Sequence, residues 1–300
     1  MKTTINCFIP FANAAQAEKT VQSLQSSDLI KKIYLLTTET TATPLPGCDI
    51  LTVSALNSSA TMRAVATHSD ADYTLLYTKY TTLSPGMFAF ERMIHIAKDS
   101  NAGMVYADHY QVAEGVQKNA PVIDYQPGSL RDDFNFGSVL LYKASALKEA
   151  VSRMKADYQF AGLYDLRLKL SQKEALVHIN EYLYSEVEND TRKSGEKIFD
   201  YVDPKNRGLQ IEMEQACTEH LKEIGGYLAP EFKKIEFSAG NFEYEASVII
   251  PVRNRIRTVK DAVRSALDQQ TTFPFNVIVI DNHSTDGTSE VLHELSSDKR

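Results

Sequence analysis

The sequence lacks the features of membrane-spanning, disulfide-rich and nucleic-acid-binding proteins. No apolar run reaches the roughly 18 residues of a transmembrane helix, and no signal-peptide core follows Met1. The three cysteines are far apart and odd in number, which favours reduced thiols and a cytoplasmic protein. A net charge of −7 argues against a basic surface for nucleic acid. Membrane proximity through a partner stays open.

What remains is the composition of a globular protein. Hydrophobic residues make up 43% of the sequence and charged residues 24%, which are ordinary fractions for a packed domain. A chain of 300 residues can bury a sizeable core and suggests about two domains. The seven histidines show no metal-ligand spacing, so we assign no metal ligands.

Two short apolar runs near the C-terminal end predict a β-strand–helix–β-strand unit. The runs are Ser247–Ile250 and Val277–Ile280, and the second leads directly into Asp281. Such a unit has a right-handed crossover and parallel strands, so both strands end at the same edge of the sheet. The segment between them carries apolar residues at helical spacing, namely Ile256, Val259, Val263, Ala266 and Leu267.

Polar residues follow both predicted strands, where ligands of parallel sheets bind. Pro251–Asn254 follows the first strand and Asp281–Asp286 follows the second. A carboxylate at a strand end can accept hydrogen bonds from a base or a ribose. We also expect Asp286 or Ser284 to be the N-cap of a following helix. An ordinary unit of this type, with a strand-end Asp that caps a turn, is the alternative.

The run SVIIPVRN followed by VIVIDNHSTDGT resembles the start of family 2 glycosyltransferases, which have the α/β GT-A fold. The sequence departs from the family at Arg253, where an aromatic residue is usual, and Asp281-Asn282 is a common variant of its acid pair. The resemblance implies a nucleotide-sugar donor, and a divalent cation (Mg²⁺ or Mn²⁺) for a complete domain. It implies these nucleotide-binding residues: Pro251, Arg253, Asn254, Asp281, Asn282 and Asp286.

The N-terminal region resembles a second copy of the same unit. CFIPFAN matches VIIPVRN, an amphipathic segment follows, and KIYLLTTET matches VIVIDNHST. Pro10 then corresponds to Pro251 and Thr37 to Asp281. Threonine cannot provide a carboxylate for the base. We therefore predict a GT-A-like domain that has lost its nucleotide acid.

The other positions that the resemblance makes functional are also changed. The metal-binding DxD motif of the family falls on Thr78-Lys79-Tyr80, and the catalytic base falls on Gly162 and Leu163. Hard cations need oxygen ligands, preferably anionic, and lysine has the opposite charge. Substitution of the cation by Lys79 is an alternative. Leu83–Gly86 is expected to turn into a helix, with Pro85 in its first turn.

We expect a degenerate GT-A-like domain over residues 1–203, a linker helix and connector over 204–243, and the start of a motif-bearing GT-A domain over 244–300. Asp190–Pro204 is expected to be an exposed loop, and Asn206–Ile224 the linker helix, ending at two glycines. Asp108-His109 is expected at a strand end, capped or solvated. Because only one strand–helix–strand–helix unit follows residue 243, we expect the sequence to be part of a longer protein.

Two functions remain open. The first is a glycosyltransferase that passes a sugar from a nucleotide-sugar to a glycan or lipid-linked acceptor in bacterial surface glycan synthesis, with catalytic residues unassigned. These 300 residues alone would be inactive. The second is a non-catalytic GT-A-like module that recognises a glycan, an acceptor or a partner subunit.

Overall fold

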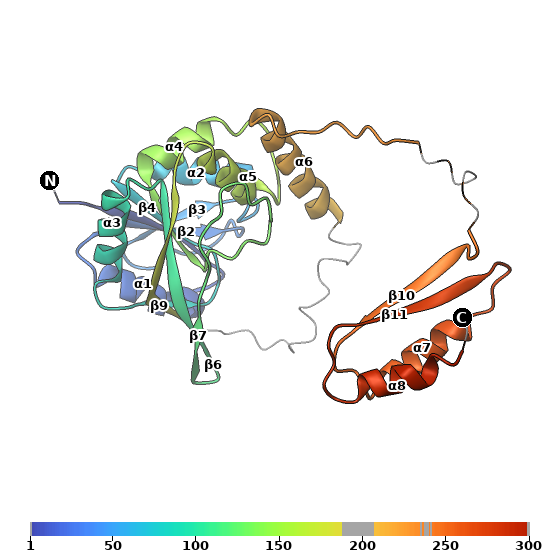
Figure 1. Cartoon of the computed structure of the whole chain (residues 1–300). Coiled ribbons are helices and arrows are strands. Elements are labelled where there is room, and N and C mark those ends of the chain that lie inside the picture. Colours follow the sequence, from blue (N-terminus) through green and yellow to red (C-terminus); the bar gives the residue numbers. More distant parts are fainter. Residues whose placement is uncertain (1, 188–206, 235, 237–239, 241, 299–300) are drawn as a thin grey trace. The chain divides into compact units, whose positions relative to one another are not determined.

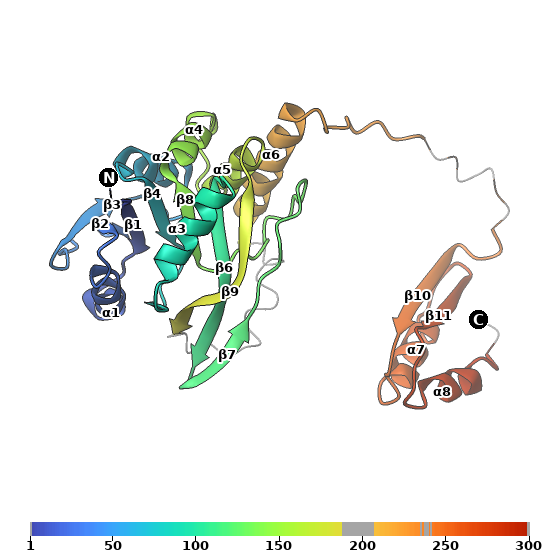
Figure 2. The ribbon, with the colours of Figure 1, turned by 60° about the vertical axis from the view of Figure 1, so that its left-hand side comes forward.

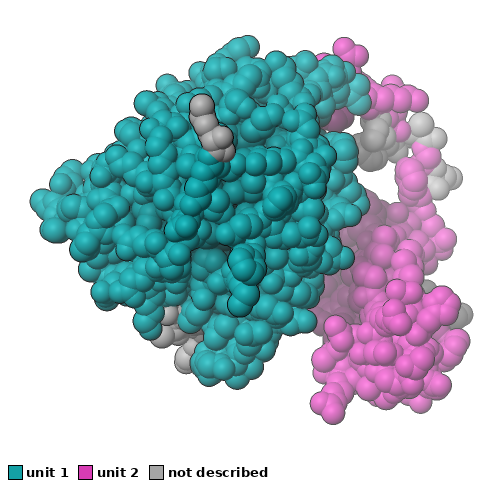
Figure 3. All heavy atoms as spheres, turned by 90° about the vertical axis from the view of Figure 1, so that its left-hand side faces the viewer, with its two compact units in different colours: residues 1–228 teal, residues 229–300 magenta. Residues whose placement is uncertain are grey.

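The computed structural model describes residues 2–187, 207–234, 236, 240 and 242–298. The chain divides into two compact units, residues 1–228 and 229–300, coloured separately in Figure 3. The expected loop over 190–204 and the expected boundary at 203 lie outside the described residues. Within the described ranges, no helix is both long and apolar enough to cross a bilayer.

The first unit is built on one sheet with the strand order β3-β2-β1-β4-β8-β6-β9-β5, with β7 paired to β6 (Figure 1). Neighbouring strands are parallel from β3 to β4, and β8 runs antiparallel to both β4 and β6. The α/β prediction is confirmed. The strands are β1 (Ile5–Pro10), β2 (Ile30–Thr37), β3 (Cys48–Thr52), β4 (Tyr73–Tyr77), β5 (Thr82–Pro85), β6 (Met104–Ala113), β7 (Val116–Ala120), β8 (Val139–Lys143) and β9 (Leu176–Val187).

Helices cover both faces of this sheet (Figure 2). Side chains of α1 and α3 pack in one buried cluster, and those of α2, α4 and α5 pack in another. Successive side chains of strand β1 point to opposite faces of the sheet, since Cys7 lies in the first cluster and Phe8 in the second. Burial of both faces explains the continuous apolar runs of the central strands. The helices are α1 (Ala14–Gln25), α2 (Ser59–His68), α3 (Ala89–Asp99), α4 (Ala144–Ser152) and α5 (Gly162–Ser171).

The helix expected as a linker, α6 (Arg207–Glu223), packs on α5 within the first unit. Its Ala216 is fully buried, and its Glu212 carboxylate accepts hydrogen bonds from the backbone N–H groups of residues 159, 160 and 161 at 3.1, 2.6 and 3.1 Å. His220 is buried and lies 3.1 Å from the side-chain nitrogen of Gln172. The helix ends as predicted, since Gly226 N–H donates to Leu221 O at 2.8 Å.

The second unit contains β10 (Ala246–Val252), α7 (Val259–Leu267), β11 (Phe275–Asp281) and α8 (Thr288–Leu295). The two strands are parallel, as predicted. Val252, Val259, Val263 and Leu267 form its small core. The other face of the sheet is apolar and exposed at Ile249, Ile278 and Ile280.

Two local predictions were wrong. Pro85 ends strand β5, and α3 begins only at Ala89, because β5 pairs antiparallel with β9 through Pro85 and Tyr184. Asp108 and His109 lie within the long strand β6 and are buried, neither solvated nor at its end. Strand β9 starts at Leu176, which is 68 residues after Asp108 (176 − 108). Pairing with β9 extends β6 past these polar residues.

The contact between α5 and α6 predicts a pH-dependent stability. Burial raises the pKa of Asp165 on α5 to about 6, although Lys169 Nζ lies 3.7 Å away. The folded chain therefore binds a proton more strongly than the unfolded chain, and stability from this group falls as pH rises from 3.8 to about 6. Relative to the native chain, Asp165→Asn should gain about 1–3 kcal/mol of unfolding free energy across this window.

Urea unfolding at about pH 4.5 and about pH 7 measures this gain. Lys169 keeps Glu223 as its partner, at 2.5 Å, in the variant. Asp28→Asn, at an exposed surface pair, is the control and should show no such gain. If both variants gained the same unfolding free energy between these pH values, the raised pKa of Asp165 would be contradicted.

Candidate functional site

Two loops lie side by side at the carboxyl ends of β10 and β11. In the parallel register Val252 is the partner of Asp281, so the segments that follow them leave the sheet together. Asn282 N–H donates to Val252 O at 2.8 Å and continues the pairing by one step. All six candidate nucleotide-binding residues therefore lie at one edge of the sheet.

Asn254 joins the first loop to the second. Its backbone N–H donates to Ser284 Oγ at 2.9 Å, and its Oδ1 accepts from Thr285 N–H at 2.8 Å. Asn254 has a left-handed backbone with φ of 52°, and His283 in the facing loop has φ of 54°. Asn tolerates this conformation better than most residues. The Asn254 side chain thus fixes the shape of the site.

Asp286 makes the second connection between the loops. One carboxylate oxygen accepts from Ile256 N–H at 3.1 Å and the other from Thr288 N–H at 3.0 Å. Thr288 is buried, and its Oγ1 in turn accepts from Arg255 N–H at 2.9 Å. The expected N-cap is shifted by one residue, because Gly287, with φ of 92°, is the N-cap of α8.

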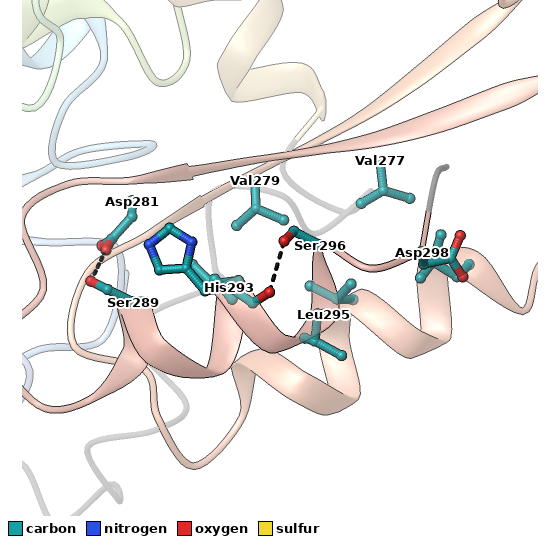
Figure 4. Close-up of a pocket in the computed structure, with 11 residues that line it drawn as sticks. Val277, Val279, Asp281, Ser289, His293, Leu295, Ser296 and Asp298 are labelled. Carbon is teal, nitrogen blue, oxygen red and sulfur yellow. Dashed lines mark hydrogen bonds between the residues drawn. The ribbon is translucent and has the colours of Figure 1, made fainter.

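Asp281 is the acid at the strand end. One carboxylate oxygen accepts from the backbone N–H and the hydroxyl of Ser284, at 3.2 and 2.5 Å. The other accepts from the Ser289 hydroxyl on α8 (Figure 4). These hydrogen bonds hold the pKa of Asp281 below its ordinary value, and the one from the Ser284 side chain has the largest effect. The site therefore presents an oriented, ionised carboxylate at neutral pH.

The other candidates face solvent. The side chains of Arg253 and Asn282 are exposed and form no hydrogen bond with another described residue, and Pro251 is exposed at the end of β10. Asp281 and Ser289 also border a cavity of about 340 Å³ between β11 and α8 (Figure 4). Its remaining wall is largely apolar, with His293 at one side.

The sequence of this site matches a known family. The family model "Glycosyl transferase family 2" matches residues 247–300. In this segment the chain is similar to that family. The matched segment holds both loops of the site, so the resemblance of the C-terminal motifs is confirmed there. The family 2 match does not extend into the first unit, whose reading as a degenerate copy stays a prediction.

Solved structures give a weaker likeness. Crystal structures of S. aureus TarS 1–349, alone and in complex with UDP-GlcNAc, are each 9% identical to the chain. Each covers 73% of this chain, with 71% and 72% of the TarS chain covered and TM-scores of 0.46 and 0.44. No curated protein matches the chain in sequence.

A buried threonine lies at the carboxyl end of β2 in the first unit. Thr37 ends β2, is buried, and accepts a hydrogen bond from Glu39 N–H at 3.1 Å. A cavity lined by Pro10 and Leu36, at the ends of β1 and β2, has a volume of about 10 Å³, near the size of one water molecule. Apolar side chains close this cavity, among them Leu36, Leu76 and Leu163.

An ion pair occupies Lys79, in the segment where the sequence resemblance predicts the metal motif. Lys79 Nζ lies 2.6 Å from Glu186 Oε1, and the Glu186 side chain is almost fully buried. His109 Nε2 lies 3.7 Å from the other oxygen of Glu186, and burial lowers the pKa of His109. Across the described parts of the chain, no group of three or more His, Cys, Asp or Glu side chains could hold a metal. Glu186 lies 107 residues beyond Lys79, so sequence reasoning missed this pair.

Gly162, where the sequence resemblance predicts the base position, packs directly on the start of α2. A Cβ atom on Gly162 would lie 2.2 Å from Ser59 N and 2.7 Å from Asn57 O. Leu163 N–H also donates to Asn57 O at 3.1 Å and holds the two segments together. An acidic side chain therefore does not fit at this position without separating α5 from α2.

Gly162→Ala should destabilise the first unit. The added methyl group meets backbone atoms, which cannot rotate away, so we expect a loss of about 1–3 kcal/mol or more in unfolding free energy. Gly208→Ala on α6 is the matched control, since its Cβ would meet only Phe160 Cε2 at 3.7 Å. Alanine favours a helix over glycine, so this control should be neutral or slightly stabilising. Urea unfolding compares both variants, and equal stabilities would contradict the packing argument.

Proposed function

We propose that residues 247–300 supply the nucleotide-binding loops of a glycosyltransferase. It transfers a sugar from a nucleotide-sugar donor to a glycan or lipid-linked acceptor in bacterial surface glycan synthesis. The observation that carries this proposal is Asp281, an ionised carboxylate held in one orientation at the end of a parallel strand. The family 2 match of the same segment supports it.

Each candidate residue has a role in this proposal. Asp281 accepts a hydrogen bond from the base or ribose, with Pro251 beside it, and Asn282 offers an exposed amide. Arg253 is exposed in the first loop and could pair with the diphosphate. Asn254 and Asp286 act by holding the loops together. A divalent cation, Mg²⁺ or Mn²⁺, would neutralise the diphosphate leaving group when bound.

The first prediction of this proposal concerns Asp281. A hydrogen bond to a charged group contributes about 1.5–3 kcal/mol, so Asp281→Ala should weaken nucleotide binding roughly 10–100-fold. Calorimetric titration of UDP, GDP and dTDP, each with Mn²⁺, into the native and variant chains measures the change. Asp268→Ala is the control, because Asp268 is an exposed acid at the opposite end of α7. An unchanged affinity, or no binding of any nucleotide to the native chain, would contradict the proposal.

A second function is favoured for the first unit, that of a non-catalytic GT-A-like binding module. Three observations support it: the burial of Thr37, the Lys79–Glu186 ion pair, and the packing of Gly162 on α2. None of these arrangements leaves a carboxylate for a nucleotide, a metal ion or an acceptor hydroxyl. In the same titration, Thr37→Val should therefore leave nucleotide affinity unchanged. A loss on this substitution would place a donor site in the first unit.

A further inference from the structure

A group of exposed cations lies at the start of helix α7 in the second unit. Residues 255–264 contain four cations and one acid, although the whole chain has a net charge of −7. We call these cations the basic surface: Arg255, Arg257, Lys260 and Arg264, all of which are exposed. A local charge of the opposite sign to that of the chain indicates a site for an anionic partner.

The cations of the basic surface are not paired with carboxylates. Among the residues that the structure describes, no ion pair joins any of them to an acid, and the Arg255 guanidinium donates only to the backbone oxygen of Asn254, at 3.4 Å. Cations of the first unit differ, since Lys32, Arg63 and Arg92 each form an ion pair with an Asp or Glu side chain. The positive charge of the basic surface can therefore meet an external anion.

The backbone at the start of α7 fixes the position of the basic surface. Arg255 O accepts hydrogen bonds from the N–H groups of residues 258 and 259, both at 2.9 Å, so the turn that carries Arg255 leads directly into α7. Lys260 and Arg264 are four residues apart and are neighbours on the helix surface. The other side of α7 packs on the sheet. The cations therefore extend from one short, fixed segment, and an anionic surface can contact several of them together.

An apolar side chain lies among these cations. Ile256 stands between Arg255 and Arg257 in the chain and is 44% exposed. At a bilayer surface, basic side chains meet the phosphate groups, and a neighbouring apolar side chain enters the boundary with the acyl chains. Single-stranded nucleic acid stacks its bases on aromatic side chains instead. Residues 253–264 include no aromatic residue, so a bilayer fits this surface better than nucleic acid.

We propose that the basic surface docks this chain on the anionic face of a lipid bilayer. Its four cations pair with lipid phosphate groups, and Ile256 enters the boundary region. The inference deepens the proposed transferase function and rests on it in one respect, because a bilayer beside the loops of the site would present a lipid-linked acceptor to them. Asn254 of those loops directly precedes Arg255. Vesicle binding needs no nucleotide, so the two proposals fail in different experiments.

One acid within this segment opposes the docking. Asp261 directly follows Lys260 and is exposed, and the other acid of this region, Asp268, lies at the far end of α7. The Asp261 carboxylate repels lipid phosphate, so the sign of the partner's charge has a direct test. One charge near an anionic bilayer changes binding about fivefold, and Asp261→Asn should strengthen binding by about that factor. Weaker binding of this variant would contradict an anionic partner.

The test is co-sedimentation of the 300-residue chain with lipid vesicles at about 0.1 M salt. One set of vesicles contains equal parts of phosphatidylglycerol and phosphatidylcholine, and the other contains phosphatidylcholine alone. The chain should bind the first set about tenfold or more tightly than the second. At about 1 M salt the screening length falls from about 10 Å to about 3 Å, and this preference should disappear. Equal binding to both sets at low salt, or binding to neither, would overturn the inference.

A soluble polyanion is the alternative partner, and inorganic polyphosphate in place of vesicles tests it. Ile256→Ala removes apolar surface that a bilayer buries and a soluble polyanion does not. This variant should bind anionic vesicles about fivefold more weakly than the native chain, and any binding of polyphosphate should be unchanged. An equal effect on both, or no effect on vesicle binding, would exclude the bilayer as the partner.

A triple variant tests whether the basic surface is the contact. Arg257→Gln, Lys260→Gln and Arg264→Gln together remove three charges and should weaken binding of anionic vesicles about 100-fold. The control variant removes three charges from exposed positions of the first unit: Lys19→Gln, Lys118→Gln and Lys148→Gln. The control should bind nearly as tightly as the native chain. Equal losses in the two variants would mean that overall charge attracts the bilayer, and would overturn the inference.

Discussion

Parallel pairing across a connecting helix is the constraint on which the candidate sites of this chain depend. In both units, the strands joined in this way end at one edge of the sheet, and their loops meet there. Backbone geometry alone brings Val252 beside Asp281 and Pro10 beside Leu36. The fold therefore fixes where a ligand could bind, while the side chains decide whether one does.

The two units use this edge in different ways. In the second unit, the strand-end acid Asp281 is oriented by two serines and stays at the surface. In the first unit, Thr37 is buried, and Lys79 is neutralised by Glu186. At this edge of the first unit, Thr37 and Lys79 therefore have their polar partners within the protein. A carboxylate placed at residue 37 would be buried, which is costly for a charged group without a partner.

The sequence predicted the parts of this structure that depend on local pattern. Strands at both motif pairs, helix α6 and its glycine stop, and the loops that hold Asp281 and Asn254 all followed from spacing and turn residues. The errors arose where distant segments pair. Strand β5 exists because it pairs with β9, and β6 passes through Asp108 for the same reason. No local signal in the sequence encodes these pairings.

Two contacts at these sites could not be predicted from the sequence, because they join residues that are far apart along the chain. Glu186 is 107 residues from Lys79, and the close approach of Gly162 to α2 involves helices that begin about 100 residues apart. From the sequence, glycine at residue 162 predicts that no base is present there. The structure adds a steric reason, because backbone atoms occupy the place of any Cβ. The sequence shows that no carboxylate is present at residue 162. The packing shows that a substitution there could not add one unless α2 and α5 also moved apart.

Hydrogen-bond capacity explains how Asp281 can be held in place and still bind a ligand. An ionised carboxylate has about four acceptor sites, and the protein occupies three of them through Ser284 and Ser289. One site remains for an N–H or O–H group of a nucleotide. The hydrogen bonds from Ser284 and Ser289 orient the carboxylate before binding, so a ligand need not break them. A loop acid without such partners would lose side-chain freedom on binding, and part of the interaction energy would offset that loss.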